Sequence, residues 1–437
     1  MKAVKVFAVV LLLASFAVAP ALASFGTTVS SVTVQNTGDA EATVTFTFYN
    51  EAGAAFTPDP LTTDGTVSNP FMLDPGESYE LYMPNANLAD GKYSLVIASD
   101  QPVVAVSNVV RTFGSLGYNG TFAGFSMGSD EIYMPSITNN CWGYYSELSV
   151  QNTGDAATDI TVDFGGGLTA TKTNIAPGAS AHWDFATGAP PGLGACVSAI
   201  ITADQPIAAV DNQYNQAGFL QTYNSFLMGA GEWGVTALYN GYYGWASSLD
   251  IQNVGEAETT VTVAFSDGDD DVTCVLDPGE KCQPYMPNEK SLGTTLFAAS
   301  VSADEPLVVV VNAANGTASL AQSSNAVAAG GMMASIPAAY NGYFGWNSSW
   351  ACVNLGAVAT DLTINYDGFG DYTFTGLAAG ETLEVYVPTD AEGPTAGNRS
   401  AVMVESSAAP IACTYNASQD ALIGTGDWAF SGNAFAE

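Results

Sequence analysis

The chain has 437 residues, with 43 acidic against only eight basic side chains, which gives a formal net charge of −35. So acidic a chain lacks the basic surface on which nucleic-acid binding depends, and the same charge disfavours binding to anionic lipid. Only 12% of the residues are charged and 47% are hydrophobic, so the composition excludes a disordered chain and supplies material for packed cores.

The first residues have the pattern of a secretory signal peptide. Lys2 and Lys5 form a basic start, an apolar run follows at 6–18, and the small residues at 21–23 precede Ser24. The apolar run is too short for a membrane span, and no later segment offers 18 uninterrupted apolar residues. We therefore expect residues 1–23 to be removed on export, leaving a secreted protein of the cell surface with no membrane span.

Four sequence repeats make up the remainder of the chain. The string Val-Gln-Asn-x-Gly, or a close variant, recurs around four marker asparagines: Asn36, Asn152, Asn253 and Asn354. Each repeat is about 100 residues long, which is too long for a solenoid unit and matches a small domain. We call the repeats beads one to four and expect them to be domains in a string, with boundaries at 24–128, 129–229, 230–330 and 331–437.

Each bead reads as a β-sandwich. After the marker, apolar residues alternate with Thr or Asp, as in Val261, Val263 and Phe265 of bead three. A two-residue period predicts antiparallel strands with one buried face. Turn signals recur about every ten residues: Asn-x-Gly, then Pro-Gly, then Asp-Gln-Pro. The sequence therefore predicts an all-β protein of four tandem immunoglobulin-like antiparallel β-sandwich domains behind the signal peptide.

At this point the residues resemble a known family. The run 150–156, with the strand and Pro-Gly turn after it, is similar to the CARDB-type immunoglobulin-like modules of bacterial exported proteins. It looks closer still to a repeat of secreted and surface proteins of Chloroflexi-type bacteria, where Tyr-Gly-Trp-x-Ser precedes Val-Gln-Asn-x-Gly; residues 243–247 and 344–348 correspond. The resemblance covers nearly the whole chain after the leader and implies spacers, stalks or surface-layer parts. Bead one departs from it because it lacks the aromatic lead-in.

The six cysteines fall two to a bead in beads two, three and four. An even number in an exported chain favours disulfides over metal ligation, and one histidine is too few for a Cys/His zinc site. We expect the pairs Cys141–Cys196, Cys274–Cys282 and Cys352–Cys413, with Cys274 and Cys282 facing each other across a hairpin.

The aromatic lead-ins before the markers are the sharpest candidates for a ligand or junction role. Aromatic rings in Gly-rich loops are suited to stacking on sugars. Amphipathic rings also suit a partly hydrated interface between a bead and the bead before it. We favour junction packing and keep carbohydrate binding open. The residues are Trp142, Tyr144, Tyr242, Tyr243, Trp245, Tyr343, Phe344 and Trp346.

An acidic turn in bead three is a weak candidate for a Ca²⁺ site. It contains Asp267, Asp269, Asp270 and Asp271. Crowded carboxylates bind Ca²⁺ through oxygen, but the spacing is not that of an EF-hand loop. We expect a solvated hairpin tip, with weak Ca²⁺ binding as the alternative and no other cofactor.

No set of residues predicts catalysis. His182 is the only histidine, and polar residues at its equivalents Glu80, Gln283 and Glu384 predict a solvent-facing strand position. We therefore expect a non-enzymatic structural or interaction protein of the cell exterior, such as a surface-layer, stalk or filament component. Its partner would be a second copy of itself or an extracellular polysaccharide. The alternative is an adhesin or carbohydrate-binding protein that uses the aromatic loops.

Overall fold

The computed structural model describes residues 7–13, 27–63, 65–113, 116–215, 219–289, 295–316, 320–419, 426–427, 429–433 and 435–436. The predicted cleavage site at 21–23 lies outside them. In these ranges the chain is built of sheets whose strands pair antiparallel, as predicted, except for one short parallel pair between Gly117–Tyr118 and Gly426–Asp427. The helices have only three or four residues. No helix in the described ranges is long and apolar enough to cross a membrane.

Beads two and three have the same topology. One long strand in each, β17 or β24, pairs in its first half with one set of strands and in its second half with another. It passes between the two sheets at Asp204-Gln205-Pro206 in bead two, where we predicted a turn. Bead two contains β12 (Ser129–Cys141), β13 (Tyr144–Asn152), β14 (Thr158–Asp163), β15 (Thr169–Ile175), β16 (Ser180–Asp184), α1 (Phe185–Gly188), β17 (Cys196–Asn215) and β18 (Leu220–Asn224). Bead three contains β19 (Ala230–Tyr242), β20 (Trp245–Asn253), β21 (Thr259–Phe265), β22 (Val272–Leu276), β23 (Lys281–Cys282), α2 (Met286–Glu289), β24 (Thr295–Asn315) and β25 (Leu320–Asn325).

In beads one and four the long strand is interrupted, so the two sheets of each sandwich are joined by a short loop. Bead one contains β1 (Phe7–Leu13), β2 (Thr27–Asn36), β3 (Ala42–Asn50), β4 (Ala55–Phe56), β5 (Leu61–Thr63), β6 (Gly65–Val67), β7 (Phe71–Leu73), β8 (Ser78–Tyr82), η1 (Met83–Asn85), β9 (Tyr93–Ser99), β10 (Val103–Phe113) and β11 (Leu116–Ala123). Bead four contains β26 (Met333–Tyr343), β27 (Trp346–Asn354), β28 (Thr360–Tyr366), β29 (Asp371–Leu377), β30 (Thr382–Tyr386), η2 (Val387–Thr389), β31 (Asn398–Ser406), β32 (Ile411–Ser418), β33 (Gly426–Asp427), β34 (Ala429–Asn433) and β35 (Phe435–Ala436).

The alternating strands have one buried face, as predicted. In β21 the side chains of Val261, Val263 and Phe265 are buried, while Thr260 and Thr262 face outward. The same alternation holds in β28 of bead four. The apolar face therefore packs between the two sheets of its sandwich.

The marker asparagine fastens two turns together in every bead. In bead three the Asn253 amide nitrogen donates to the carbonyl oxygens of Ala257 (2.8 Å) and Leu276 (3.0 Å), and its side-chain oxygen accepts from the Gly255 N–H (2.9 Å). The other three markers make the same set of bonds. Since both a donor and an acceptor are used inside a buried turn, the repeated motif is explained by structure.

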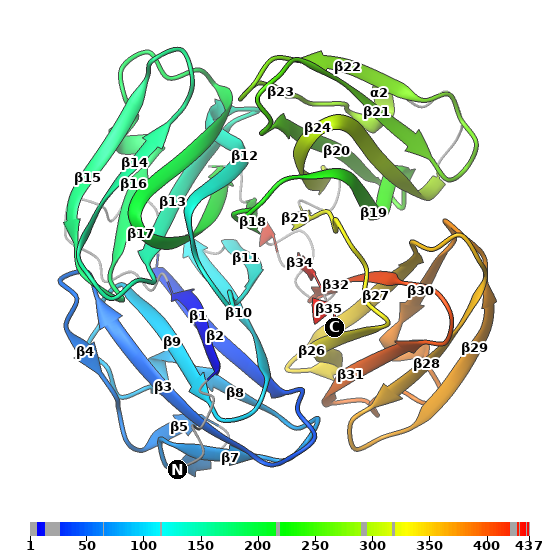
Figure 1. Ribbon diagram of the computed structural model, residues 1–437. Coiled ribbons are helices and arrows are strands. Elements are labelled where there is room, and N and C mark those ends of the chain that lie inside the picture. Colours follow the sequence, from blue (N-terminus) through cyan, green and yellow to red (C-terminus); the bar gives the residue numbers. More distant parts are fainter. Residues whose placement is uncertain are drawn as a thin grey trace, which may run out of the picture.

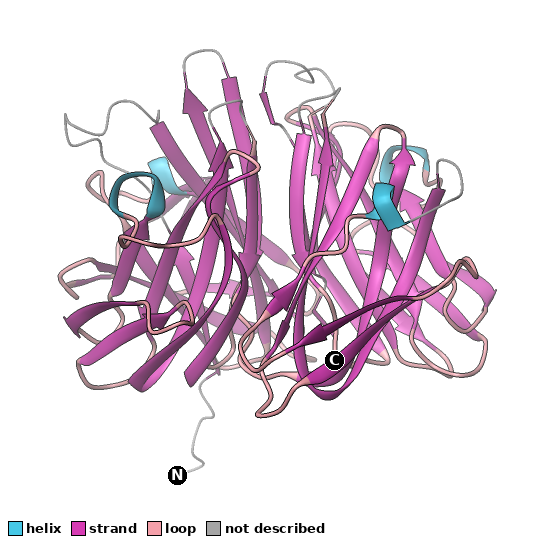
Figure 2. Ribbon diagram, turned by 90° about the horizontal axis from the view of Figure 1, so that it is seen from above, coloured by secondary structure: helices cyan, strands magenta, loops and turns pink. Residues whose placement is uncertain are grey.

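The four beads form a closed ring, not the string that we expected (Figure 1). Four strands, β11, β18, β25 and β34, line its centre, and each contacts its two neighbours. Asparagine amides link them: Asn224 Nδ2 donates to the Ala123 carbonyl (2.6 Å), and Asn325 Nδ2 donates to the Asn224 carbonyl (2.8 Å). Viewed at right angles to Figure 1, most strands run roughly along the axis of the ring (Figure 2).

The hydrophobic cores also continue between beads. One buried cluster includes Ile201 of bead two and Val301 of bead three, and another joins Val210 of bead two to the core of bead one. Val106 of bead one belongs to the cluster of bead four. Each bead therefore has its own sandwich, but part of its apolar surface is buried against the neighbouring bead.

The structure contains the disulfides Cys141–Cys196, Cys274–Cys282 and Cys352–Cys413. The third joins directly opposite residues of β27 and β32. The expected hairpin at Cys274 and Cys282 is wrong. β22 pairs with β21 and β23 pairs with β20, so this disulfide connects strands at opposite ends of the seven-stranded sheet of bead three.

Candidate functional site: clefts between the beads

The aromatic lead-ins form β-hairpin turns with an aromatic residue at the tip. Trp142-Gly143, Tyr243-Gly244 and Phe344-Gly345 each connect two strands, and all six residues have positive φ angles. This is the geometry of a type I′ turn, in which Asn or Gly is the usual first residue. The tip rings lie in solvent: Trp142 is 85% exposed, Tyr243 84% and Phe344 79%. A bulky exposed ring in a left-handed conformation is uncommon and suggests a role in binding.

The rings beside the tips are half-buried and packed. Tyr242 stacks on Tyr239 with ring centres 6.3 Å apart, and Tyr343 stacks on Tyr340 at 6.0 Å. Tyr144, Trp245 and Trp346 are likewise partly buried. The predicted aromatic set therefore divides into packed rings, which support the hairpin, and exposed tips.

Each lead-in faces the bead that follows it around the ring. We expected contact with the preceding bead, and that expectation is wrong. The lead-in of bead four is the clearest case, because ring closure places it against bead one. Here Tyr340, Tyr343, Phe344 and Trp346 form one wall of a cavity of about 420 Å³ that we call the four–one cleft.

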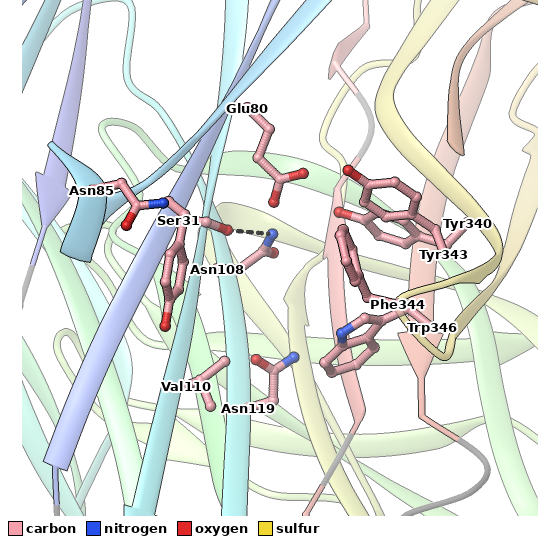
Figure 3. A pocket seen from close by; sticks show the side chains of 11 residues that line it. Ser31, Glu80, Asn85, Asn108, Val110, Asn119, Tyr340, Tyr343, Phe344 and Trp346 are labelled. Carbon is pink, nitrogen blue, oxygen red and sulfur yellow. Dashed lines mark hydrogen bonds between the residues drawn. The ribbon is translucent and has the colours of Figure 1, made fainter. Parts of the chain in front are cut away.

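Bead one supplies a polar wall to the four–one cleft (Figure 3). Asn108 Nδ2 donates to Ser31 Oγ at 3.4 Å, and Glu80 is held by Arg399 of bead four, with Nε and Oε2 3.7 Å apart. Asn119 has no solvent exposure, and in the part of the chain that the structure describes neither its amide oxygen nor its amide nitrogen has a hydrogen-bond partner. A buried amide without partners is costly unless a ligand or water satisfies it.

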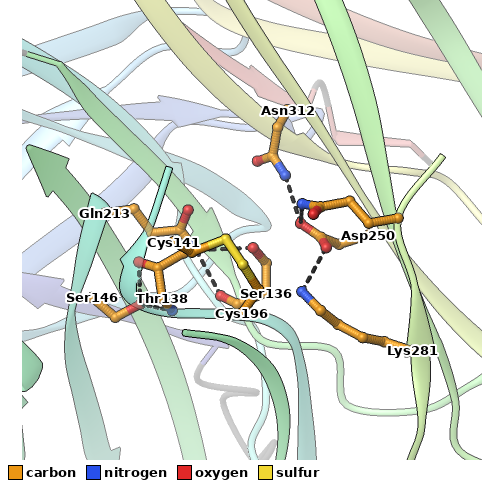
Figure 4. Close-up of a disulfide and its surroundings, with 10 residues drawn as sticks. Ser136, Thr138, Cys141, Ser146, Cys196, Gln213, Asp250, Lys281 and Asn312 are labelled. Atoms are coloured by element: carbon orange, nitrogen blue, oxygen red, sulfur yellow. Dashed lines mark hydrogen bonds and ion pairs between the residues drawn. A yellow bond between two sulfur atoms is a disulfide. The ribbon is translucent and has the colours of Figure 1, made fainter. Parts of the chain in front are cut away.

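A second cavity, the two–three cleft, lies between beads two and three. Its volume is about 410 Å³, and Trp142 and Tyr144 of bead two line it together with Tyr285 of bead three. Figure 4 shows its polar floor, where the fully buried Asp250 carboxylate accepts from Lys281 Nζ (2.7 Å) and from Asn312 Nδ2 (2.8 Å). The Cys141–Cys196 disulfide and Gln213 lie on the opposite side.

The spaces beside the lead-ins are not all alike. Between beads three and four, only about 20 Å³ is open beside the lead-in of bead three, where Thr236 and Thr414 hydrogen bond at 2.8 Å. A separate cavity of about 440 Å³ lies elsewhere at this junction, between Trp233 of bead three and Leu355 of bead four, and none of the exposed aromatic tips lines it. Between beads one and two, the Glu147 carboxylate pairs with Lys92 (3.0 Å) and lies 3.7 Å from Arg111, and burial raises the pKa of Glu147.

Two other predicted sites are not assembled. Asp267, Asp269, Asp270 and Asp271 lie in the turn between β21 and β22, mostly in solvent, and no group of three or more metal-binding side chains occurs among the described residues. The turn is a hairpin tip, as favoured.

His182 is not solvent-facing, which corrects our interpretation. Its side chain is only 13% exposed, Ser149 Oγ lies 2.8 Å from Nδ1, and Glu51 Oε1 lies 3.9 Å from Nε2. Burial lowers the pKa of His182 to about 3. Ser149 is buried and lines neither cleft.

The sequence analysis missed the polar residues of both clefts. One signal was available, namely polar residues where the other copies differ. Asn119 occupies the strand position that Leu220 and Ala321 hold in beads two and three. Each of the three residues pairs with the residue two positions after the equivalent asparagine, which is Asn108, Asn212 or Asn312. Asp250 likewise stands where bead four has Ala351.

No family model and no curated protein matches this chain. Among solved structures, the protein titled Thermotoga maritima 1070 is similar over 27% of this chain and 92% of its own, with 18% identity and a TM-score of 0.19. The major pilin of Streptococcus pyogenes aligns over 58% of this chain and 95% of its own, with 9% identity and a TM-score of 0.14. At these TM-scores neither likeness indicates a function for this chain.

Proposed function

We propose that the protein is an exported, non-enzymatic binding protein of the cell exterior that holds extracellular polysaccharide in the four–one and two–three clefts. The observation that carries the proposal is the presence of an exposed aromatic ring beside each of these two cavities. Each has a volume of about 400 Å³, with Phe344 or Trp142 at its rim, whereas the cavity of about 440 Å³ between beads three and four is lined by none of the exposed tips. Cavities of this size are typical of small-molecule sites.

The chemistry of both clefts suits a sugar ring. A pyranose has an apolar face that packs against an aromatic ring, and hydroxyls that need both donors and acceptors. Asn119 offers an unpaired donor and acceptor in the first cleft. The second cleft is lined by Gln213 and Asn312, whose amide nitrogens donate to the Ser136 carbonyl and to Asp250. With a net charge of −35, the protein would repel acidic glycans, so neutral glycans are the favoured ligands.

Binding without turnover is proposed because the carboxylates of the clefts are already paired. Asp250 is neutralised by Lys281, and Glu80 lies beside Arg399. A glycosidase needs two carboxyl groups free to act as acid and base or nucleophile. Export is supported by the leader pattern, and all six cysteines are paired, as is usual in oxidising compartments.

Affinity measurements on neutral polysaccharides test the proposal, with three matched variants. Trp142→Ala and Phe344→Ala each remove the exposed ring at the rim of an open cleft. Tyr243→Ala is the control, since Tyr243 has the same type of turn, a similar φ angle and a similar exposure but lines neither cleft. We expect at least a tenfold weaker affinity for the first two variants and no change for the control, with unaltered thermal stability in all three.

An equal loss of affinity in all three variants would refute the cleft as the site, because the exposed tip rings alone would then account for glycan binding. No loss in any variant would refute the carbohydrate-binding role. Asn119→Leu adds a check inside the four–one cleft: it restores the residue type of bead two and should reduce binding without reducing stability.

A further inference from the structure

Bead one is completed by residues that belong to the predicted export signal. Strand β1 pairs antiparallel with β9 over seven residues, from Phe7 opposite Ser99 to Leu13 opposite Tyr93, and lies at the edge of the sheet β1-β9-β3-β4. It also contacts β10 and, in bead two, β13. Residues 7–13, within the apolar run of the leader, therefore form an edge strand of the first sandwich.

The other beads fill the same position with their own first strand, which is β12, β19 or β26. The register is equivalent in all four beads. In each, the residue three positions before the Asp-Gln-Pro segment or its variant pairs with a residue of this strand. The pairs are Val9 with Ile97, Ile132 with Ile201, Trp233 with Val301 and Ala334 with Val404. Bead one alone receives this strand from the leader.

Removal of residues 1–23 would leave the position open. Only residues 24–26 would then precede β2, and three residues span about 10 Å, too little for a strand of seven. The β9 edge would lose its ladder of backbone hydrogen bonds beside Leu95 and Ile97, which belong to the core of bead one and have no solvent exposure in the complete sheet. An unpaired apolar edge of this kind is a template for another strand.

We propose that processing converts bead one into an acceptor, whose β9 edge takes an extended strand donated by another polypeptide. The inference rests on the export part of the proposed function and is independent of the clefts. Strand addition of this kind gives affinity through main-chain hydrogen bonds and specificity through alternate side chains.

The sibling strands define the chemistry of the donor. At the equivalent position and two residues later they carry Ile132 and Met134, Trp233 and Val235, and Ala334 and Ile336, all of which are at most 5% exposed. The donor is therefore an extended segment of about seven residues with apolar side chains at alternate positions.

A synthetic peptide with the sequence of residues 129–137 is the probe, tested against the chain 24–437. We expect one peptide to bind per chain and to increase the protection of β9 amides against hydrogen exchange at least tenfold. A control peptide with Ile132→Asp and Met134→Asp should not bind, because two charges would enter the core. A chain in which residues 129–137 and a Gly/Ser linker replace residues 1–23 should show the same protection without added peptide and should not bind it.

Four outcomes decide the matter. Light scattering that finds oligomers of 24–437, but only monomers of the linked chain, would support the acceptor and identify a second copy as the donor. If the peptide does not bind and β9 amides are equally protected in both chains, bead one closes by itself and the proposal fails. An intact mass that includes residues 1–23 in protein from the native host would also overturn it, since β1 would then remain in place. Polysaccharide affinity should be equal in both chains, so a failure of the cleft proposal can be told apart.

Discussion

Replacement of Asn253 by alanine should selectively destabilise bead three. The substitution removes three hydrogen bonds and leaves the carbonyl of the buried Leu276 without its partner. A buried group left unsatisfied costs about 1–3 kcal/mol, and each of the two half-buried bonds contributes about 0.5–1 kcal/mol. We therefore expect a loss of about 3 kcal/mol in the free energy of opening bead three.

Hydrogen exchange followed by mass spectrometry is the suitable assay, because a chain of four coupled domains does not unfold in a two-state manner. Amides of β20 and β21 should exchange about a hundredfold faster in Asn253→Ala, which corresponds to about 3 kcal/mol. Glu256→Ala is the control, since this exposed residue lies in the same turn. A change below 0.5 kcal/mol for Asn253→Ala, or an equal change in the control, would refute the structural interpretation of the repeated motif.

Three further outcomes concern buried charges. Burial raises the pKa of Asp211 to about 7, so the native state holds a proton that the unfolded chain releases above about pH 4. The free energy of unfolding should therefore fall by up to about 4 kcal/mol between pH 4 and pH 7. Urea titrations of Asp211→Asn should lack this fall. Burial lowers the pKa of His182 to about 3, so the unfolded chain gains a proton first and stability should fall as the pH drops from 6.5 towards 3; acid titration of His182→Gln should lack that component. Lys281→Met should destabilise bead three by about 3 kcal/mol, because the Asp250 charge would remain buried without its partner. In thermal melts, the double variant with Asp250→Asn should regain most of the lost stability.

The sequence by itself determined the architecture of each bead. Alternation in segments such as Val261, Val263 and Phe265 predicts half-buried strands, and the structure has them there. Local patterning was sufficient because a two-residue period assigns side chains to one face without reference to the rest of the fold. The same reasoning failed for His182, whose strand face is polar but lies against bead one, with Glu51 3.9 Å away.

Ring closure, the clefts and the open strand position were decided by tertiary structure. Arg399 donates to Ser78, 321 residues earlier in the chain, and no periodicity in the sequence indicates that beads four and one meet. The angle between successive sandwiches sets whether a chain of domains extends or closes, and it results from side chains packed at every junction at once. The lead-in of bead four therefore borders a cavity of about 420 Å³ while that of bead three borders one of about 20 Å³, although the two sequences are nearly the same.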